Sequence, residues 1–195
     1  MTFLLSITNI NAQSKSEEMM DKVPYAEIPE DPATFSSGNL FGRMIDGLGF
    51  RYYWATDSLR AIDLEYKISE DSRSCGETLD HLHGLSKFIL SVAVSDPSIR
   101  DQKDDDVEWE TLRKQTLNNL MRASEAVKLL DEEGVSELKI VFKRGDNVTE
   151  YPMWNVINGP VSDAIYHVGQ IVAFRRAAGN PMHPGVSVFS GRNRG

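Results

Sequence analysis

The sequence predicts an all-α protein, an antiparallel four-helix bundle with a small β-hairpin between the third and fourth helices. Four long segments carry apolar residues at alternating spacings of three and four, the period of an amphipathic helix. Two short β-like runs flank a turn at Arg144-Gly145-Asp146. Four helices of this length, joined by short links, most simply pack antiparallel. We expect an extended lead-in (1–37), the bundle (38–182) and a tail (183–195).

The first helix is expected to begin at a Ser36-Ser37 cap, because serine side chains satisfy the free amides of a helix start. The polar segment before it contains three prolines, which favour an extended lead-in. The apolar residues of the helix recur at helical spacing: Leu40, Phe41, Met44, Ile45, Leu48 and Tyr52.

The second helix is expected over residues 76–94. Its predicted core face consists of Leu82, Leu85, Ile89 and Val92, and its predicted polar side of Asp80, Gly84 and Lys87. An acidic run, Asp104 to Asp106, follows it. We interpret this run as capping the positive end of the next helix rather than as a cation site.

The third helix is expected over residues 107–131, with Gly134 as its C-terminal cap. Its predicted bundle seam consists of Trp109, Leu112, Thr116, Leu120, Ala123, Val127 and Leu130. The two strands of the hairpin are expected at residues 138–142 and 147–154.

The last helix is expected over residues 161–178. Asn158-Gly159-Pro160 is predicted to break the chain before it, and Gly179-Asn180-Pro181 is predicted to end it.

Composition limits the classes of function. The net charge is −8, from 29 acidic and 21 basic residues, which disfavours a nucleic-acid partner. No run of about 18 apolar residues is present to span a membrane. Residues 1–13 are similar to the back half of a secretory signal, but the basic start of such a signal is missing. We therefore expect a cytoplasmic protein. The alternative is an exported protein, if residues 1–13 are the remnant of a signal peptide. The single cysteine, Cys75, excludes an intramolecular disulfide and is interpreted as a small residue filling space at a helix start.

A candidate metal site comes from the spacing of Asp163 and His167. Residues four apart share one face of a helix, so the carboxylate and the imidazole can bind one ion. On the second helix, His81 and His83 point to nearly opposite sides, so at most one is expected to face the core. His81 begins the series that continues into the apolar face, and it is the predicted third ligand. The alternative is a metal-free pair between a core histidine and Asp163; His183 reads as a loop residue.

These residues resemble the DinB-like (DinB/YfiT) superfamily of metal-binding four-helix bundles. The likeness rests on Glu77 to His81, on Asp163 to His167 followed by Val168-Gly169-Gln170, and on the closing Arg175 to Pro181, and it covers residues 38–182. It implies an up-and-down-type bundle whose second and fourth helices supply three ligands, and a homodimer. The usual first ligand of the last helix is histidine, so Asp163 is a departure. Val168 replaces a basic residue that is frequent there.

Two imidazoles and one carboxylate suit a divalent ion, Zn, Ni, Fe or Mn. Since some DinB-like members resemble thiol-dependent transferases, the resemblance implies a metal-dependent enzyme of thiol S-transferase type, acting on a small molecule or thiol. The alternative is a non-catalytic metal- or ligand-binding module of the stress-response or sensor kind. Aromatic side chains for a pocket are Trp109, Trp154 and Tyr166, although core packing is the favoured interpretation of each. Tyr52, Tyr53 and Glu77 are candidate acids or bases, and nothing in the sequence selects one of them.

Overall fold

The structure, a computed structural model, describes residues 23–102 and 107–195. The chain is mostly helical, with a small antiparallel hairpin, as the sequence predicts in outline. Its long helices are α2 (Ser37–Thr56), α4 (Cys75–Ala93), α6 (Trp109–Lys128) and α9 (Ser162–Ala177). Its shorter elements are α3 (Ala61–Leu64), α5 (Ser98–Asp101), α7 (Glu132–Glu137), β1 (Lys139–Arg144), β2 (Asn147–Pro152), α8 (Met153–Val156), the π-helical turn η1 (Ile157–Val161), β3 (Val186–Ser187) and β4 (Arg192–Asn193).

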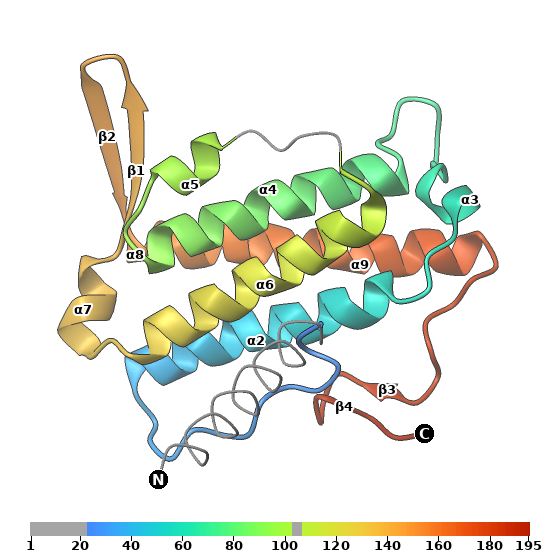
Figure 1. Cartoon of the computed structure of the whole chain (residues 1–195), viewed down its shortest axis with the longest axis horizontal. Helices are drawn as coiled ribbons and strands as arrows, with labels where there is room; N and C mark the ends of the chain where they lie inside the picture. The colour runs from blue at the N-terminus through green and yellow to red at the C-terminus, as the bar shows by residue number, and fades with distance from the viewer. Residues whose placement is uncertain (1–22, 103–106) are drawn as a thin grey trace, which may run out of the picture.

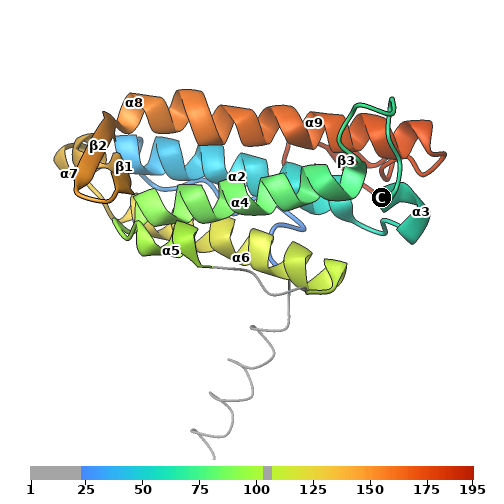
Figure 2. The ribbon, with the colours of Figure 1, turned by 90° about the horizontal axis from the view of Figure 1, so that it is seen from above.

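The four long helices lie side by side, and each contacts two others (Figures 1 and 2). Helix α2 packs on α6 and α9, and α4 packs on α6 and α9. Their facing sides form one apolar core that includes Ile45, Leu79, Leu120 and Ile171. Of the residues predicted on apolar faces, Ile45, Ile89 and Leu120 are buried, whereas Leu40 is 49% exposed.

Helices α4 and α6 run in the same direction (Figure 1). Hydrogen bonds advance together along both helices, from His83–Thr116 at 2.9 Å to Asn119–Ser86 at 3.1 Å. The predicted antiparallel arrangement is therefore wrong for this pair. Apolar periodicity shows which side of a helix is buried but not its direction. The connection over residues 94–108 is long enough to return along a helix of roughly 30 Å.

Helices α2 and α6 approach each other closely at the start of α2. Ser36 caps α2 as predicted, because its Oγ accepts from the backbone amide of Asn39 at 3.2 Å. Two residues later, a Cβ on Gly38 would lie 2.5 Å from the carbonyl oxygens of Val127 and Leu130. Glycine at this position permits the close contact, since these neighbours are backbone atoms.

We expect Gly38→Ala to destabilise the protein by about 1–3 kcal/mol, the usual cost of forcing an extra methyl into a packed interface. Gly47→Ala is the matched control in the same helix. Its new methyl would meet only the mobile end of Arg51, at 3.2 Å. Alanine should therefore stabilise that position by up to about 1 kcal/mol. Urea unfolding of both variants tests this, and equal effects would contradict the close contact.

A buried carboxylate joins the lead-in segment to the helix pair. Asp46 on α2 is 2% exposed and accepts hydrogen bonds from Tyr25 Oη at 3.0 Å and Ser124 Oγ at 2.6 Å. The ammonium of Lys128 lies 2.6 Å from its other oxygen. Burial, and next the charge of Asp46, raise the pKa of Tyr25, which keeps this phenol a donor.

The closing motif of the last helix has a structural role. Buried Arg175 donates to the carbonyl oxygens of Trp54 at 2.9 Å and Ala55 at 3.1 Å. Asn180 donates to the carboxylate of Asp63 at 2.7 Å. Hydrogen bonds from Arg60, and then from Asn180, hold the pKa of Asp63 well below its usual range. The Arg175–Pro181 segment thus fixes the end of α9 to the end of α2 and to α3.

Several predicted boundaries are corrected. Helix α6 ends at Lys128, and Gly134 lies inside α7, whose cap is Asp131. Asp131 Oδ1 accepts from the amide of Gly134 at 2.8 Å, so an aspartate N-cap was mistaken for a glycine C-cap. The strands are shifted to residues 139–144 and 147–152.

The predicted break at Asn158-Gly159-Pro160 is present as a kink at Gly159, whose φ of −92° and ψ of −105° lie outside helical geometry. The prediction missed that the chain is helical on both sides of this kink, because α8 and the turn η1 lead directly into α9. The kink accommodates Pro160, because the residue before a proline is disfavoured in helical geometry and Gly159 departs from it.

The two described ends of the chain lie against each other below α2 in Figure 1. The amide of Ile28 donates to the carbonyl of Gly191 at 2.9 Å, and Arg192 pairs with Glu27. We call this contact the terminal clasp. Of the tail residues considered for packing, Val186 and Val188 line a groove beside α2 and α9, and Phe189 is exposed.

Two other interpretations lie outside the described residues: the signal-like stretch at 1–13 and the cap at Asp104 to Asp106. Within the described ranges, no helix has the length and apolarity needed to cross a membrane.

Candidate metal centre

The structure brings His81, Asp163 and His167 together at the contact between α4 and α9. Nε2 of His81 lies 3.1 Å from Oδ2 of Asp163, and Nε2 of His167 lies 3.4 Å from Oδ1. One nitrogen or oxygen atom from each residue lies within 4.8 Å of the others. This group, here the ligand triad, joins residues 82 positions apart in the chain. It is the set that the helical spacing predicts.

The triad is open to solvent on one side. The exposed fractions of the side chains are 33% for His81, 44% for Asp163 and 13% for His167. The two imidazole rings meet edge to face, with centroids 4.6 Å apart and planes at 88°. The open side lowers the cost of a carboxylate on a helix face that otherwise turns inward.

Gln170 determines how His167 presents its nitrogens. Its Oε1 lies 2.7 Å from Nδ1 of His167, and an amide oxygen only accepts. With this amide orientation, Nδ1 carries the proton, and the neutral ring turns the lone pair of Nε2 toward Asp163. Such a hydrogen bond is the usual means of orienting a metal-binding histidine. The sequence identified Gln170 only as part of the resemblance, without this role.

Two acceptors therefore face each other across the 3.4 Å between His167 Nε2 and Asp163 Oδ1. This contact is repulsive unless a positive charge lies between the atoms. A proton on Nε2 would make His167 an imidazolium and give a simple ion pair. A divalent ion would satisfy the same lone pairs and His81 Nε2 as well. Both alternatives from the sequence fit the distances, and the donor set fits a metal.

His83 corrects one expectation about the second helix. It is 4% exposed and lies between α4 and α6, where Nδ1 contacts Thr116 Oγ1 at 2.9 Å. Lys87, predicted on the polar side, is also buried. Helix α4 packs on α6 and on α9, so it has two covered sides, and both His81 and His83 face a neighbouring helix. A prediction that gives each helix one buried face does not describe a helix that contacts two neighbouring helices.

The candidate acids and bases are engaged elsewhere. Glu77 accepts from the amide of Ser74 at 2.6 Å and completes a capping box at the start of α4. Tyr52 is fully buried, and burial raises its pKa. Tyr53 packs under the guanidinium of Arg113, with 4.6 Å to the ring centroid. None of the three is placed as an acid or base of the triad by these contacts.

Cys75 fills space at the start of α4, as predicted. It is completely buried, and burial, with a further contribution from Asp63, raises the pKa of its thiol to about 11.

The three aromatic residues considered as pocket lining differ. Trp109 packs partly buried against the core, as the favoured interpretation predicts. Trp154 is 77% exposed and Tyr166 is 66% exposed, so core packing is wrong for both. Tyr166 lies beside the triad, with its ring centroid 5.5 Å from that of His167.

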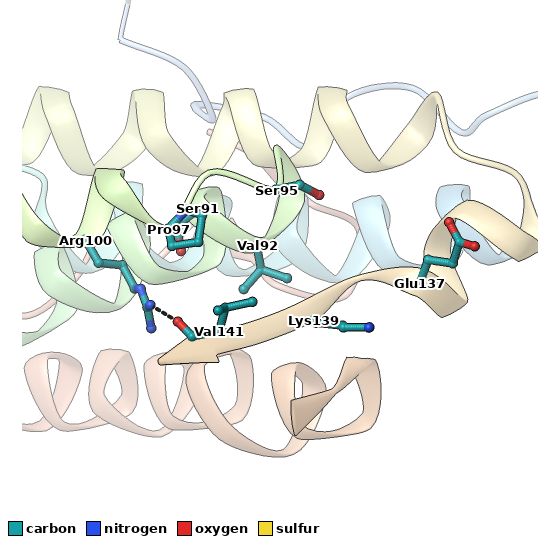
Figure 3. Close-up of a pocket in the computed structure, with 8 residues that line it drawn as sticks. All are labelled: Ser91, Val92, Ser95, Pro97, Arg100, Glu137, Lys139 and Val141. Carbon is teal, nitrogen blue, oxygen red and sulfur yellow. Dashed lines mark hydrogen bonds between the residues drawn. The ribbon is translucent and has the colours of Figure 1, made fainter. Parts of the chain in front are cut away.

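An open pocket of about 520 Å³ lies next to the triad and includes Asp163 and Tyr166. Another concavity, about 340 Å³, lies between α4, α5 and β1 (Figure 3). The two cationic side chains that line this concavity already have partners. Arg100 donates to the carbonyl of Val141, and Lys139 pairs with Glu150 at 3.0 Å. The pocket at the triad, in contrast, includes a candidate metal ligand, Asp163.

Comparison of the sequence with protein-family models finds no match, and comparison with curated proteins finds none either. The case for a metal centre rests on the geometry of the ligand triad and on the residues that orient it.

Proposed function

We propose that this chain is a divalent-metal-binding protein of the DinB-like four-helix-bundle type, with His81, Asp163 and His167 as ligands. The observation that carries the proposal is that one ligand atom each of His81, Asp163 and His167 lies within 4.8 Å of the others, with Nδ1 of His167 held 2.7 Å from Oε1 of Gln170. Two imidazoles and a carboxylate suit Zn, Ni, Fe or Mn. The order of motifs that resembles the DinB-like superfamily supports the same assignment.

The proposed activity is of the thiol S-transferase type: the sulfur of a low-molecular-weight thiol forms a bond to an electrophilic carbon of a small-molecule substrate, and the thiol proton passes to solvent or to the group that is displaced. A divalent ion at the triad would act as a Lewis acid and favour the thiolate form of a low-molecular-weight thiol. Asp163 contributes the negative charge of the site, and Gln170 keeps His167 in one tautomer. The solvent-open side, next to the pocket of about 520 Å³, is where a substrate can enter.

Metal content tests the first part of the proposal. The full chain, purified anaerobically without chelator, should retain about one divalent ion per molecule by elemental analysis. Asp163→Ala should lose it. His183→Ala is the matched control, because this exposed histidine accepts from the amide of Gly185 in the tail and is not part of the triad. A wild type without bound metal, or equal retention in both variants, would overturn the proposal.

A second candidate function is a non-catalytic metal or ligand sensor. It is favoured by the capping-box role of Glu77, the burial of Tyr52 and the packing of Tyr53 against Arg113. A panel of thiols and electrophiles separates the two functions. Thiol consumption that requires the metal supports the transferase. A metal-loaded protein that turns over none of them supports the sensor. The homodimer implied by the resemblance stays a prediction.

A further inference from the structure

The pocket beside the triad has a lining that selects for one kind of ligand. Its walls come from α4 and α9, and its floor from η1. Leu85 and Phe88 face it from α4, Gly159 and Pro160 from η1, and Asp163 and Tyr166 from α9. Its volume of about 520 Å³ lies within the usual range for small-molecule sites.

Apolar and aromatic groups dominate this lining. Phe88 is half-buried, whereas the ring of Tyr166 is mostly exposed and is held beside His167. A flat apolar ligand would cover the Tyr166 ring and remove that apolar surface from water. In the described part of the lining, the only charged side chain is the acidic Asp163. In the chain without bound metal, an anionic ligand would therefore meet a carboxylate and no cation among these side chains.

The floor of the pocket depends on the π-helical turn. Gly159 has φ −92° and ψ −105°, outside helical geometry, and Ser162 Oγ donates to the carbonyl of Ile157 at 2.6 Å. Pro160 is buried beneath the pocket side of this turn. π-type turns inside helices occur frequently at functional sites. Here the turn directly precedes the helix that carries Asp163 and His167.

We infer that this pocket binds an uncharged, ring-bearing apolar group, and that this group belongs to the substrate of the proposed metal-dependent reaction. The inference rests on the proposed function only where it calls the ligand a substrate. The pocket and its preference for neutral apolar rings follow from Phe88, Tyr166 and the carboxylate of Asp163.

Two fluorescent probes with the same ring system test the preference. N-phenyl-1-naphthylamine is neutral, and 1-anilinonaphthalene-8-sulfonate adds a single negative charge. Titrations use the full chain as purified and again after any metal is removed with a chelator, in roughly 0.15 M salt to screen the net charge. The two probes are compared on the metal-free samples, where no cation offsets the charge of Asp163. We expect the neutral probe to bind at least about tenfold more tightly than the anionic one. Equal affinity, or tighter binding of the anion, would overturn the inference.

Variants locate the probe. Tyr166→Ala should weaken binding of the neutral probe about tenfold, and Tyr166→Leu by less, because leucine keeps apolar surface. Trp154→Ala is the control, since this exposed aromatic residue lines a different apolar pocket between α2, α7 and α8. An effect of Trp154→Ala instead of Tyr166→Ala would place the probe elsewhere and overturn the inference.

Metal content measured on the same samples separates the two proposals. Tyr166-dependent binding in a chain that retains no metal would support the pocket and reject the metal centre. Retained metal, with probe binding unaffected by Tyr166→Ala, would support the metal centre and reject the pocket assignment.

Discussion

Asp163→Asn is expected to weaken divalent-metal binding by more than the roughly 10–100-fold that follows loss of an outer hydrogen-bond partner of a ligand. Asparagine keeps the size of the side chain and one carbonyl oxygen, but it removes the negative charge between the two imidazoles. Competition with a chromophoric chelator near neutral pH measures the dissociation constant. The exposed site of Asp163 means that the variant should fold as the wild type does.

Gln170→Ala completes this series. It leaves all three ligands in place and removes only the acceptor for His167 Nδ1, 2.7 Å away. We expect it to weaken metal binding by roughly 10–100-fold, less than Asp163→Asn. His183→Ala should leave the dissociation constant unchanged. If Gln170→Ala had no effect while Asp163→Asn did, His167 would not depend on this hydrogen bond for its orientation.

Lys128→Met is expected to lower the free energy of unfolding by about 3 kcal/mol, because it leaves the buried carboxylate of Asp46 without its cation. Methionine retains the apolar stem, which packs where a Cβ on Gly42 would lie, 2.6 Å from Lys128 Cγ. Tyr25 and Ser124 still donate to Asp46, so the expected loss is at the low end for a broken buried pair. Urea unfolding at neutral pH measures it.

Two comparisons identify the cause. In the double variant Lys128→Met with Asp46→Asn, neither residue of this pair is charged, so no unpaired carboxylate is buried at position 46. We expect part of the lost stability to return. Lys139→Met removes a cation from the Lys139–Glu150 pair on the hairpin, whose side chains are 52% and 49% exposed. It should cost at most about 1 kcal/mol. Equal losses for Lys128→Met and Lys139→Met would show that burial of Asp46 does not decide the effect.

The helices were predictable from local signals, and their directions were not. Apolar spacing located α2, α4, α6 and α9 to within a few residues. The sequence carries a further signal at the start of α4. Ser74 and Glu77 form a Ser-x-x-Glu capping box, which places the first residue of the helix at Cys75, one residue before the predicted start. The parallel course of α4 and α6 depends on how the connection over residues 94–108 returns, and no local pattern encodes that.

The ligand triad was predictable because Asp163 and His167 are one helical turn apart, and that spacing survives whatever the helix packs against. Its long-range member required a choice between His81 and His83. The choice of His81 agrees with the structure, although the reason was incomplete, since both histidines face a neighbouring helix. The sequence located the interruption at Asn158-Gly159-Pro160, but it did not predict the helical residues of α8 and η1 before it, since such a triplet ordinarily ends a helix.

The terminal clasp turns the described chain into a closed ring without a covalent bond. Glu27 and Arg192, which close it, are 165 positions apart in the sequence. Each long helix would therefore keep the same neighbours in space if the chain began and ended at another point of this ring. Opening it at the exposed hairpin turn, Gly145-Asp146, would produce two segments that still meet at the α2–α9 and α4–α9 contacts and at the clasp. The order of the helices along the chain is thus separable from the arrangement that brings His81 to Asp163.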